Sequence, residues 1–228
     1  IEMYQKEGIN VHYCGHPLIK QLPEKADREQ FFAKHGLDTT RPLVSIFPGS
    51  RTIELRFLAN TFIKSAKQLQ KKHPEIQFCI SHAPNLSDDI FDKYINGTDF
   101  KVIKGENQAL LSISDSLILA SGTVALEAAL YQIPMIIGYK GPWILYLAYL
   151  LVRCIKKVSL PNIITGEDIV PELIQAKFNT ENICYETEKN LYNKEYRIGF
   201  IKALGMVKEK LSDKYSAEEA ANEIIKTL

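Results

Sequence analysis

Two apolar runs in this chain each end in a small-residue turn that leads into a helix-like stretch. Residues 43–47 are followed by the turn 48–51 (PGSR), and residues 116–120 by the turn 121–123 (SGT). Such a turn leaves backbone N–H groups free at the start of a helix, where the helix dipole also favours an anion. Both turns follow strand-like runs, so we expect them at one edge of a sheet. Together they predict a site for a nucleotide diphosphate.

The side chains of the first turn suit phosphate binding. Ser50 can cap the following helix and donate to a phosphate, and Arg51 can place its guanidinium fork on a diphosphate. The alternative is an ordinary helix N-cap followed by a surface arginine. The turn matches neither the Walker A pattern nor G-x-G-x-x-G, so this interpretation does not depend on the common nucleotide fingerprints.

The second turn is followed by an acidic residue on an otherwise apolar helix. Thr123 and Glu127 are four residues apart and therefore share one helix face, with Ser121 and Gly122 just before them. A carboxylate one turn inside such a helix can accept hydrogen bonds from both ribose hydroxyls of a nucleotide. The alternative is a salt bridge between Glu127 and a nearby lysine.

Three other places could contact a ligand or a partner. Asn162 follows the sheet region and could bind a base or a sugar, although it could equally be an ordinary turn residue. His16 lies in a Gly-His-Pro turn, where a structural role is the alternative. The apolar stretch 142–152 contains Trp143, the single tryptophan, and is flanked by lysine and arginine. It fits an interfacial helix or an acyl-chain contact, or else a core or subunit-interface helix.

The elements that would position these residues alternate regularly along the chain. Short apolar runs separated by helix-length segments predict an α/β fold with a doubly wound, Rossmann-like parallel sheet. The predicted strands are 43–47, 77–82, 101–104, 116–120 and 134–139, and the predicted helices of this region are 24–35, 53–72, 87–96, 106–113 and 123–131. A short strand is also expected at 11–14, and 159–164 is expected to be a loop with a short strand. Helices are then expected at 168–176, 181–192, 195–211 and 216–227.

This pattern predicts three parts of the chain. Residues 1–23 are expected to be a connector or hinge from a preceding domain, 24–180 a nucleotide-binding domain, and 181–228 helices that pack on the domain or cross between domains. The sequence begins at Ile1 and in mid-pattern, which suggests a piece of a longer protein.

Composition narrows the functional classes. The 28 basic and 27 acidic residues nearly balance, which argues against a broad nucleic-acid interface. The four cysteines are widely spaced, without a CxxC pair or zinc-ligand spacing, which favours a reducing cytoplasmic setting. No apolar run reaches the roughly 18–20 residues that a membrane-spanning helix needs.

Taken together, several motifs resemble lipid-A-disaccharide synthase. The resemblance covers nearly the whole chain, in order and spacing. It is carried by residues 15–18 (GHPL), 48–55 (PGSR followed by EL), 120–127 (ASGTVALE), 134–140 (PMIIGYK), 159–167 (SLPNIITGE) and 170–173 (VPEL). The combination of SLPNII and VPEL is the most specific part, because SGT…E helices occur in several nucleotide-sugar enzymes.

The resemblance implies the donor-binding half, plus hinge, of an inverting GT-B glycosyltransferase. Such an enzyme transfers 2,3-diacylglucosamine from UDP to 2,3-diacylglucosamine 1-phosphate, without a cofactor or metal. The products are UDP and lipid A disaccharide 1-phosphate. The resemblance also implies a bacterial protein at the inner face of the cytoplasmic membrane. A homodimer is a further possibility at this point. The acceptor site and the general base are expected outside this chain, so that the chain alone binds donor without transferring it.

The resemblance also implies roles for individual residues. Arg51 would be catalytic in the electrostatic sense, because it would offset charge on the departing diphosphate. Glu127 would bind the ribose, Asn162 would lie at the uracil or sugar, and His16 would face the donor from the hinge. The remaining implied contacts are Ser50, Ser121, Gly122 and Thr123 to the diphosphate, and Trp143, Leu147 and Leu150 to acyl chains or membrane.

Two further classes of function remain open at this point. Another GT-B-like enzyme of UDP-sugars, such as a UDP-GlcNAc 2-epimerase or the transferase that acts on lipid I, would use similar turns. A non-catalytic nucleotide-binding fragment would keep the fold without the reaction.

Overall fold

A computed structural model describes residues 2–142, 157–211 and 216–226. Its centre is a six-stranded sheet in the order β3-β2-β1-β4-β5-β6, and every neighbouring pair of strands is parallel. The strands are β1 (Leu43–Phe47), β2 (Gln77–His82), β3 (Lys101–Lys104), β4 (Ser116–Ala120), β5 (Met135–Tyr139) and β6 (Glu172–Ile174). The predicted doubly wound α/β fold is therefore confirmed.

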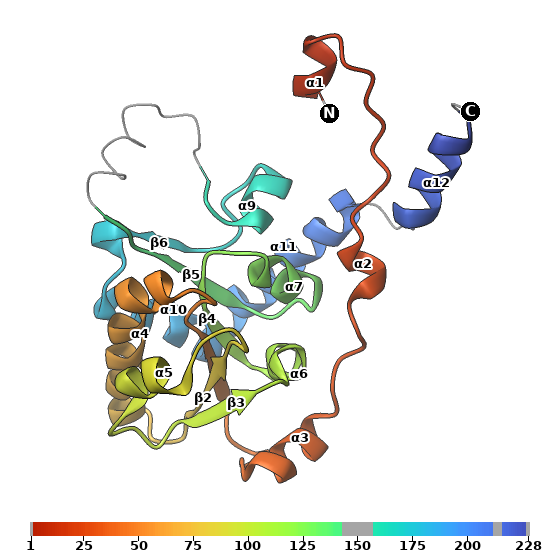
Figure 1. The fold of residues 1–228 in the computed structure, drawn as a ribbon. Helices are drawn as coiled ribbons and strands as arrows, with labels where there is room; N and C mark the ends of the chain where they lie inside the picture. The colour runs from red at the N-terminus through yellow and green to blue at the C-terminus, as the bar shows by residue number, and fades with distance from the viewer. Residues whose placement is uncertain (1, 143–156, 212–215, 227–228) are drawn as a thin grey trace.

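Helices cover both sides of this sheet, whereas the first and the last helix lie away from it (Figure 1). Those before and between the first five strands are α1 (Glu2–Lys6), α2 (Leu18–Gln21), α3 (Arg28–His35), α4 (Thr52–Lys72), α5 (Asp88–Ile95), α6 (Asn107–Ile113) and α7 (Val124–Leu130). Those that follow are α9 (Leu160–Thr165), the 3-10 turn η1 (Gln175–Lys177), α10 (Thr180–Tyr192), α11 (Lys194–Leu211) and α12 (Ser216–Lys226).

Alternating strand residues send side chains into two separate cores. On β4, Leu117 and Leu119 face a core completed by α3, α6, α7 and α11, while Ile118 faces a second core completed by α4, α5 and α10. Strands β1 and β4 are buried at all five of their residues, and β5 is buried at every residue except Tyr139, because helices cover both faces of the sheet. Helices α10 and α11 thus complete the two cores, since Ile183 and Leu204 are fully buried within them.

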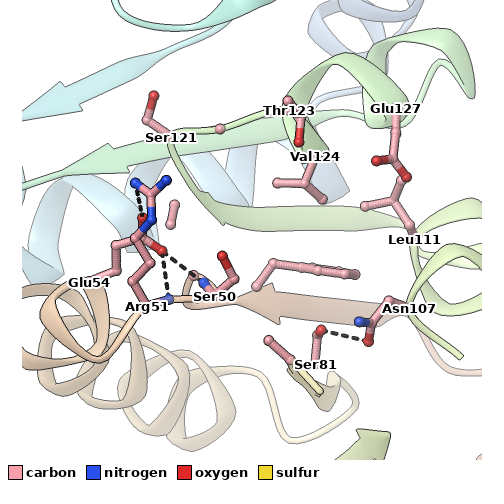
Figure 2. Close-up of a pocket in the computed structure, with 15 residues that line it drawn as sticks. Ser50, Arg51, Glu54, Ser81, Asn107, Leu111, Ser121, Thr123, Val124 and Glu127 are labelled. Atoms are coloured by element: carbon pink, nitrogen blue, oxygen red, sulfur yellow. Dashed lines mark hydrogen bonds and ion pairs between the residues drawn. The ribbon is translucent and has the colours of Figure 1, made fainter. Parts of the chain in front are cut away.

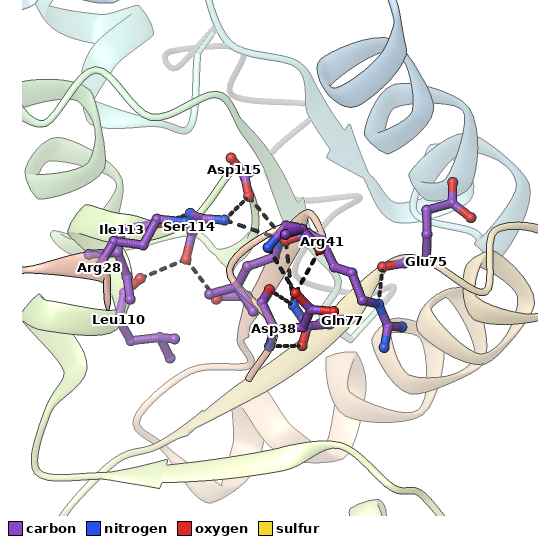
Figure 3. A network of polar contacts seen from close by, with 12 residues as sticks. Arg28, Asp38, Arg41, Glu75, Gln77, Leu110, Ile113, Ser114 and Asp115 are labelled. Carbon is purple, nitrogen blue, oxygen red and sulfur yellow. Dashed lines mark hydrogen bonds and ion pairs between the residues drawn. The ribbon is translucent and has the colours of Figure 1, made fainter. Parts of the chain in front are cut away.

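A polar network ties the amino-terminal edge of the sheet together (Figure 3). Arg28 on α3 donates to Asp115 Oδ2 at 2.8 Å and to the Ile113 carbonyl, and its guanidinium lies 4.3 Å from the Phe32 ring centroid. The same Asp115 oxygen accepts from the Leu43 N–H at 2.8 Å, at the first residue of β1. This carboxylate therefore fixes α3 and the start of β1 to the chain just before β4.

Several predicted elements differ from the structure. Residues 11–14 form no strand, because among the described residues the edge strands β3 and β6 lie away from this segment (Figure 1). Instead the Tyr13 hydroxyl donates to the Leu211 carbonyl at 3.0 Å. The predicted loop 159–164 is helix α9, with Pro161 in its first turn and Gly166 ending it at φ +77°. The predicted helix 168–176 is instead β6 followed by η1, because β5 offers an edge to which residues 172–174 bond.

None of the helices among the described residues has the length and apolar character needed to cross a membrane.

Candidate functional site

A cavity of about 410 Å³ lies at the carboxyl edge of the sheet, over the ends of β1, β2 and β4. Ligands of doubly wound folds bind at this edge, where the strand order reverses. In this sheet the reversal falls between β1 and β4. The lining residues are Phe47, Gly49, Ser50, Arg51, Glu54, Ser81, Ala83, Asn107, Leu111, Ala120, Ser121, Gly122, Thr123, Val124 and Glu127. The structure thus brings both predicted turns into one cavity.

The first turn presents an exposed arginine held near its own helix. The Arg51 side chain is 77% exposed, and its Nη1 lies 3.7 Å from Glu54 Oε1. The N–H groups of Ser50 and Arg51 are occupied, because both donate to Glu54 Oε2, at 2.8 and 3.2 Å. The anion at this helix start is therefore the protein's own carboxylate, and the exposed guanidinium remains available to a ligand.

The second turn is more open. Gly122 and Thr123 are exposed at the start of α7, and the Ser121 hydroxyl donates to the Val158 carbonyl at 3.3 Å. Figure 2 shows Ser121 and Arg51 near one end of the cavity and Glu127 at the other. A bound diphosphate would fit between the two turns, with the rest of a nucleotide extending toward Glu127.

The Glu127 carboxylate is half-buried at the wall of the cavity. Burial raises the pKa of this carboxyl above its usual value, and a hydrogen bond with Gln108 offsets part of the effect. Within the described ranges no lysine or arginine pairs with it, so the salt-bridge alternative has no support there. A desolvated carboxylate facing a cavity can accept strong hydrogen bonds from ligand hydroxyls.

Sequence reasoning missed two polar residues of this cavity. Ser81 at the end of β2 donates its hydroxyl to Asn107 Oδ1 at 2.8 Å, across to the start of α6 (Figure 2). The position of Ser81 at the carboxyl end of a predicted strand was the available signal. Leu111 and Phe47 add apolar surface beside this pair, so this end of the cavity can hold a flat ring with polar edges.

Two predicted site residues lie outside this cavity. His16 is in the segment before α2, where its Nδ1 accepts from the Leu18 N–H at 3.2 Å. Asn162 is 1% exposed, and its amide is used inside the protein. It exchanges two 2.9 Å hydrogen bonds with the Val170 backbone and donates to Glu172 at 2.8 Å. These contacts hold α9 to the start of β6, and the ligand roles of His16 and Asn162 stay predictions.

The predicted acyl or membrane contacts, Trp143, Leu147 and Leu150, lie outside the described residues. Among the residues that the structure describes, no group of three or more His, Cys, Asp or Glu side chains is arranged to hold a metal ion.

Comparison with solved structures supports the fold. A UDP-GlcNAc 2-epimerase from Neisseria meningitidis, solved with UDP-GlcNAc bound, superposes with a TM-score of 0.65 at 15% identity, over 97% of this chain and 58% of that one. WaaG, a glycosyltransferase involved in lipopolysaccharide biosynthesis, gives a TM-score of 0.52 at 16% identity, over 92% of this chain and 54% of WaaG. At these identities the likeness shows a Rossmann-like GT-B half and nothing finer.

Comparison of sequences is more specific. The lipid-A-disaccharide synthases of Geobacter sulfurreducens and Trichlorobacter lovleyi are 33% and 35% identical to this chain, over 100% and 92% of its length. The matches span 60% and 56% of those relatives, so the chain corresponds to somewhat more than half of each. The sequence profile described as lipid-A-disaccharide synthetase matches residues 1–225. The chain therefore belongs to the lipid-A-disaccharide synthetase family.

Proposed function

We propose that this chain is the donor-binding half of an inverting transferase that moves 2,3-diacylglucosamine from UDP to 2,3-diacylglucosamine 1-phosphate. The observation that carries the proposal is the single cavity formed by the 48–51 and 121–123 turns with Glu127 on its wall. Family membership supports the reaction class. The likeness to UDP-GlcNAc 2-epimerases extends to the fold alone, so an epimerase reaction has no observation of its own in its favour.

In the proposed complex the nucleotide follows the cavity. Its diphosphate lies between Arg51 and the 121–123 turn, its ribose hydroxyls donate to Glu127, and its base lies toward Asn107 and Leu111. This order follows from the chemistry of the lining, because the exposed cation is at one end and the carboxylate at the other. The cavity volume is in the range of small-ligand pockets.

The chemistry requires the charge on UDP to be stabilised as it leaves. The acceptor hydroxyl oxygen bonds to the anomeric carbon, the bond from that carbon to the diphosphate oxygen breaks, and UDP departs with the electron pair. Arg51 would offset the growing negative charge. The proton of the acceptor hydroxyl passes to a base that we place in the part of the relatives' length that this chain does not cover.

The acylated substrates also suggest where the protein works. Both the donor and the acceptor carry acyl chains, so we propose that the protein associates peripherally with the inner face of the bacterial cytoplasmic membrane. The same proposal includes a homodimer of two copies of the protein. Sedimentation with and without vesicles tests for this dimer.

Calorimetric titration with UDP tests the proposal, using the wild-type chain and Arg51→Ala. Saturable binding that weakens about tenfold or more in the variant is expected, because a charge-assisted hydrogen bond contributes about 1.5–3 kcal/mol. Arg56→Ala is the matched control, since Arg56 is exposed on the same helix and does not line the cavity. Equal affinities of all three proteins, or no saturable binding at millimolar UDP, would contradict the assignment of the site.

A further inference from the structure

We propose that Glu54 is a resident anion at the phosphate end of the cavity, and that its carboxylate must leave the 48–51 turn when a nucleotide diphosphate binds. This inference rests on the proposed function. It assigns Glu54 as a positioning residue that acts through the turn and through Arg51.

The contacts of Glu54 are those that a phosphate would make. Its Oε2 accepts from the Ser50 N–H at 2.8 Å and from the Arg51 N–H at 3.2 Å, while Oε1 lies 3.7 Å from Arg51 Nη1 (Figure 2). Two backbone donors and one guanidinium therefore converge on one carboxylate. Backbone N–H groups at a helix start bind phosphate in the same way that they bind a carboxylate.

The turn is built around this carboxylate. Gly49 has φ +109°, and a Cβ added there would lie 2.3 Å from Glu54 Oε2 and 2.7 Å from Glu54 Cβ. Only glycine leaves the space that the carboxylate fills. The Glu54 side chain is 24% exposed whereas that of Arg51 is 77% exposed. The carboxylate is therefore held in place, and the guanidinium extends into solvent beside it.

A carboxylate and a diphosphate cannot share these donors. Each N–H has one hydrogen to donate, and two like charges a few ångströms apart repel each other. Binding of UDP would thus require the Glu54 side chain to rotate out of the turn. Its return would favour release of UDP after transfer. The cost applies only to ligands that carry phosphate, because a nucleoside without phosphate never reaches the turn.

The test compares UDP and uridine binding to wild type and to Glu54→Gln. The glutamine carbonyl oxygen can still accept both backbone N–H groups, so the turn keeps its bonds while the negative charge is removed. We expect UDP to bind about tenfold more tightly to Glu54→Gln. A neutral amide oxygen accepts hydrogen bonds more weakly than a carboxylate, so the diphosphate displaces it from the two N–H groups more easily. Uridine affinity should be unchanged. Asp89→Asn is the charge-matched control, because Asp89 is exposed in the first turn of α5 and does not line the cavity.

Glu54→Asp provides an independent variant if glutamine prevents folding, which thermal melting would reveal. Aspartate keeps the charge but is one methylene shorter, so it cannot reach both N–H groups and should also bind UDP more tightly than wild type. If the wild-type chain binds UDP and the Glu54 variants bind it with equal or lower affinity, this inference is overturned and the proposed function is not affected. A failure of the wild-type chain to bind UDP would instead count against the proposed function. A gain shared by Asp89→Asn would reduce the effect to net charge and would also overturn the inference.

Discussion

Replacing Arg28 by methionine should destabilise the fold while leaving the nucleotide site intact. Methionine keeps an unbranched apolar stem over Phe32 but removes the guanidinium. That group bonds to Asp115 at 2.8 Å and to the Ile113 carbonyl, at the amino-terminal edge of the sheet (Figure 3). The candidate site lies at the opposite, carboxyl edge. Stability and binding should therefore separate in this variant.

The size of the loss follows from the exposure of the pair. The Arg28 and Asp115 side chains are 32% and 30% exposed. The free energy lost when this ion pair is broken should therefore lie between that of an exposed pair, about 0–1 kcal/mol, and that of a buried pair, about 3–5 kcal/mol. The lost contact with the face of Phe32 adds about 0.5–1 kcal/mol. Asp115 keeps the Leu43 N–H as a partner, which limits the penalty. We expect a loss of about 2–3 kcal/mol, or about 4–12 °C in Tm for a chain of this size.

The assay is urea unfolding followed by circular dichroism, with UDP titration of the folded variant. Lys34→Met is the control, because the Lys34–Glu106 pair has one side chain 61% exposed and should contribute little. A loss in Arg28→Met no larger than that of the control would refute the view that this network braces the sheet. A large loss of UDP affinity in a folded Arg28→Met protein would refute the separation of the two edges.

Three further substitutions test other parts of the structure. Glu127→Gln should weaken UDP and uridine binding about tenfold or more in calorimetry, because the ribose loses a charged acceptor. Burial raises the pKa of Glu127 in the fold, so the native state binds this proton more tightly and the contribution of Glu127 to the free energy of unfolding falls as the pH rises past the usual value of 4.5. In urea unfolding, the free energy of unfolding of the variant relative to that of wild type should therefore be higher at pH 7 than at pH 4, and a difference that does not change with pH would contradict the assignment. Asn162→Ala should lose about 2–4 kcal/mol in urea unfolding, because it orphans the buried Val170 backbone groups, and a change below about 1 kcal/mol would be inconsistent with those contacts. Gly138→Ala should lower Tm, at a cost of about 1–3 kcal/mol or more, since the new methyl would lie 2.4 Å from the Phe178 ring; an unchanged Tm would show that the ring can move away.

Most of the sheet could be predicted because its strands are local signals. Residues 43–47, 77–82, 101–104 and 116–120 are strands with the predicted bounds, and the predicted 134–139 begins one residue later, at Met135. Each is a short apolar run between turn-forming residues, and burial on both faces makes that pattern nearly continuous. The sixth strand could not be found in this way, because Glu172–Ile174 is only three residues long and is a strand only by bonding to β5.

The parts of the candidate site that are formed by local turns could be predicted from the sequence. The parts that are formed by contacts between distant elements could not. Both turns and Glu127 were found from residue type and spacing, and the structure places them in one cavity. Ser81 had a signal in its place at the end of a predicted strand, whereas its contact with Asn107 had none, because only the folded chain brings the start of α6 beside the end of β2. The occupation of the first turn by Glu54 had a sequence signal, an acidic residue three positions after the helix cap, which is typical of a capping box.

The sequence by itself therefore determined the α/β alternation, the two small-residue turns and the family to which the chain belongs, because these depend on residues close together in the chain. Only the tertiary structure decided which of those residues share a cavity. It buried Asn162 of α9 against the start of β6, left Arg51 exposed, and brought Ser81 beside Asn107. The physical reason is that a hydrogen-bonding group takes whichever partner the folded chain brings to it, and spacing along the sequence does not specify that partner.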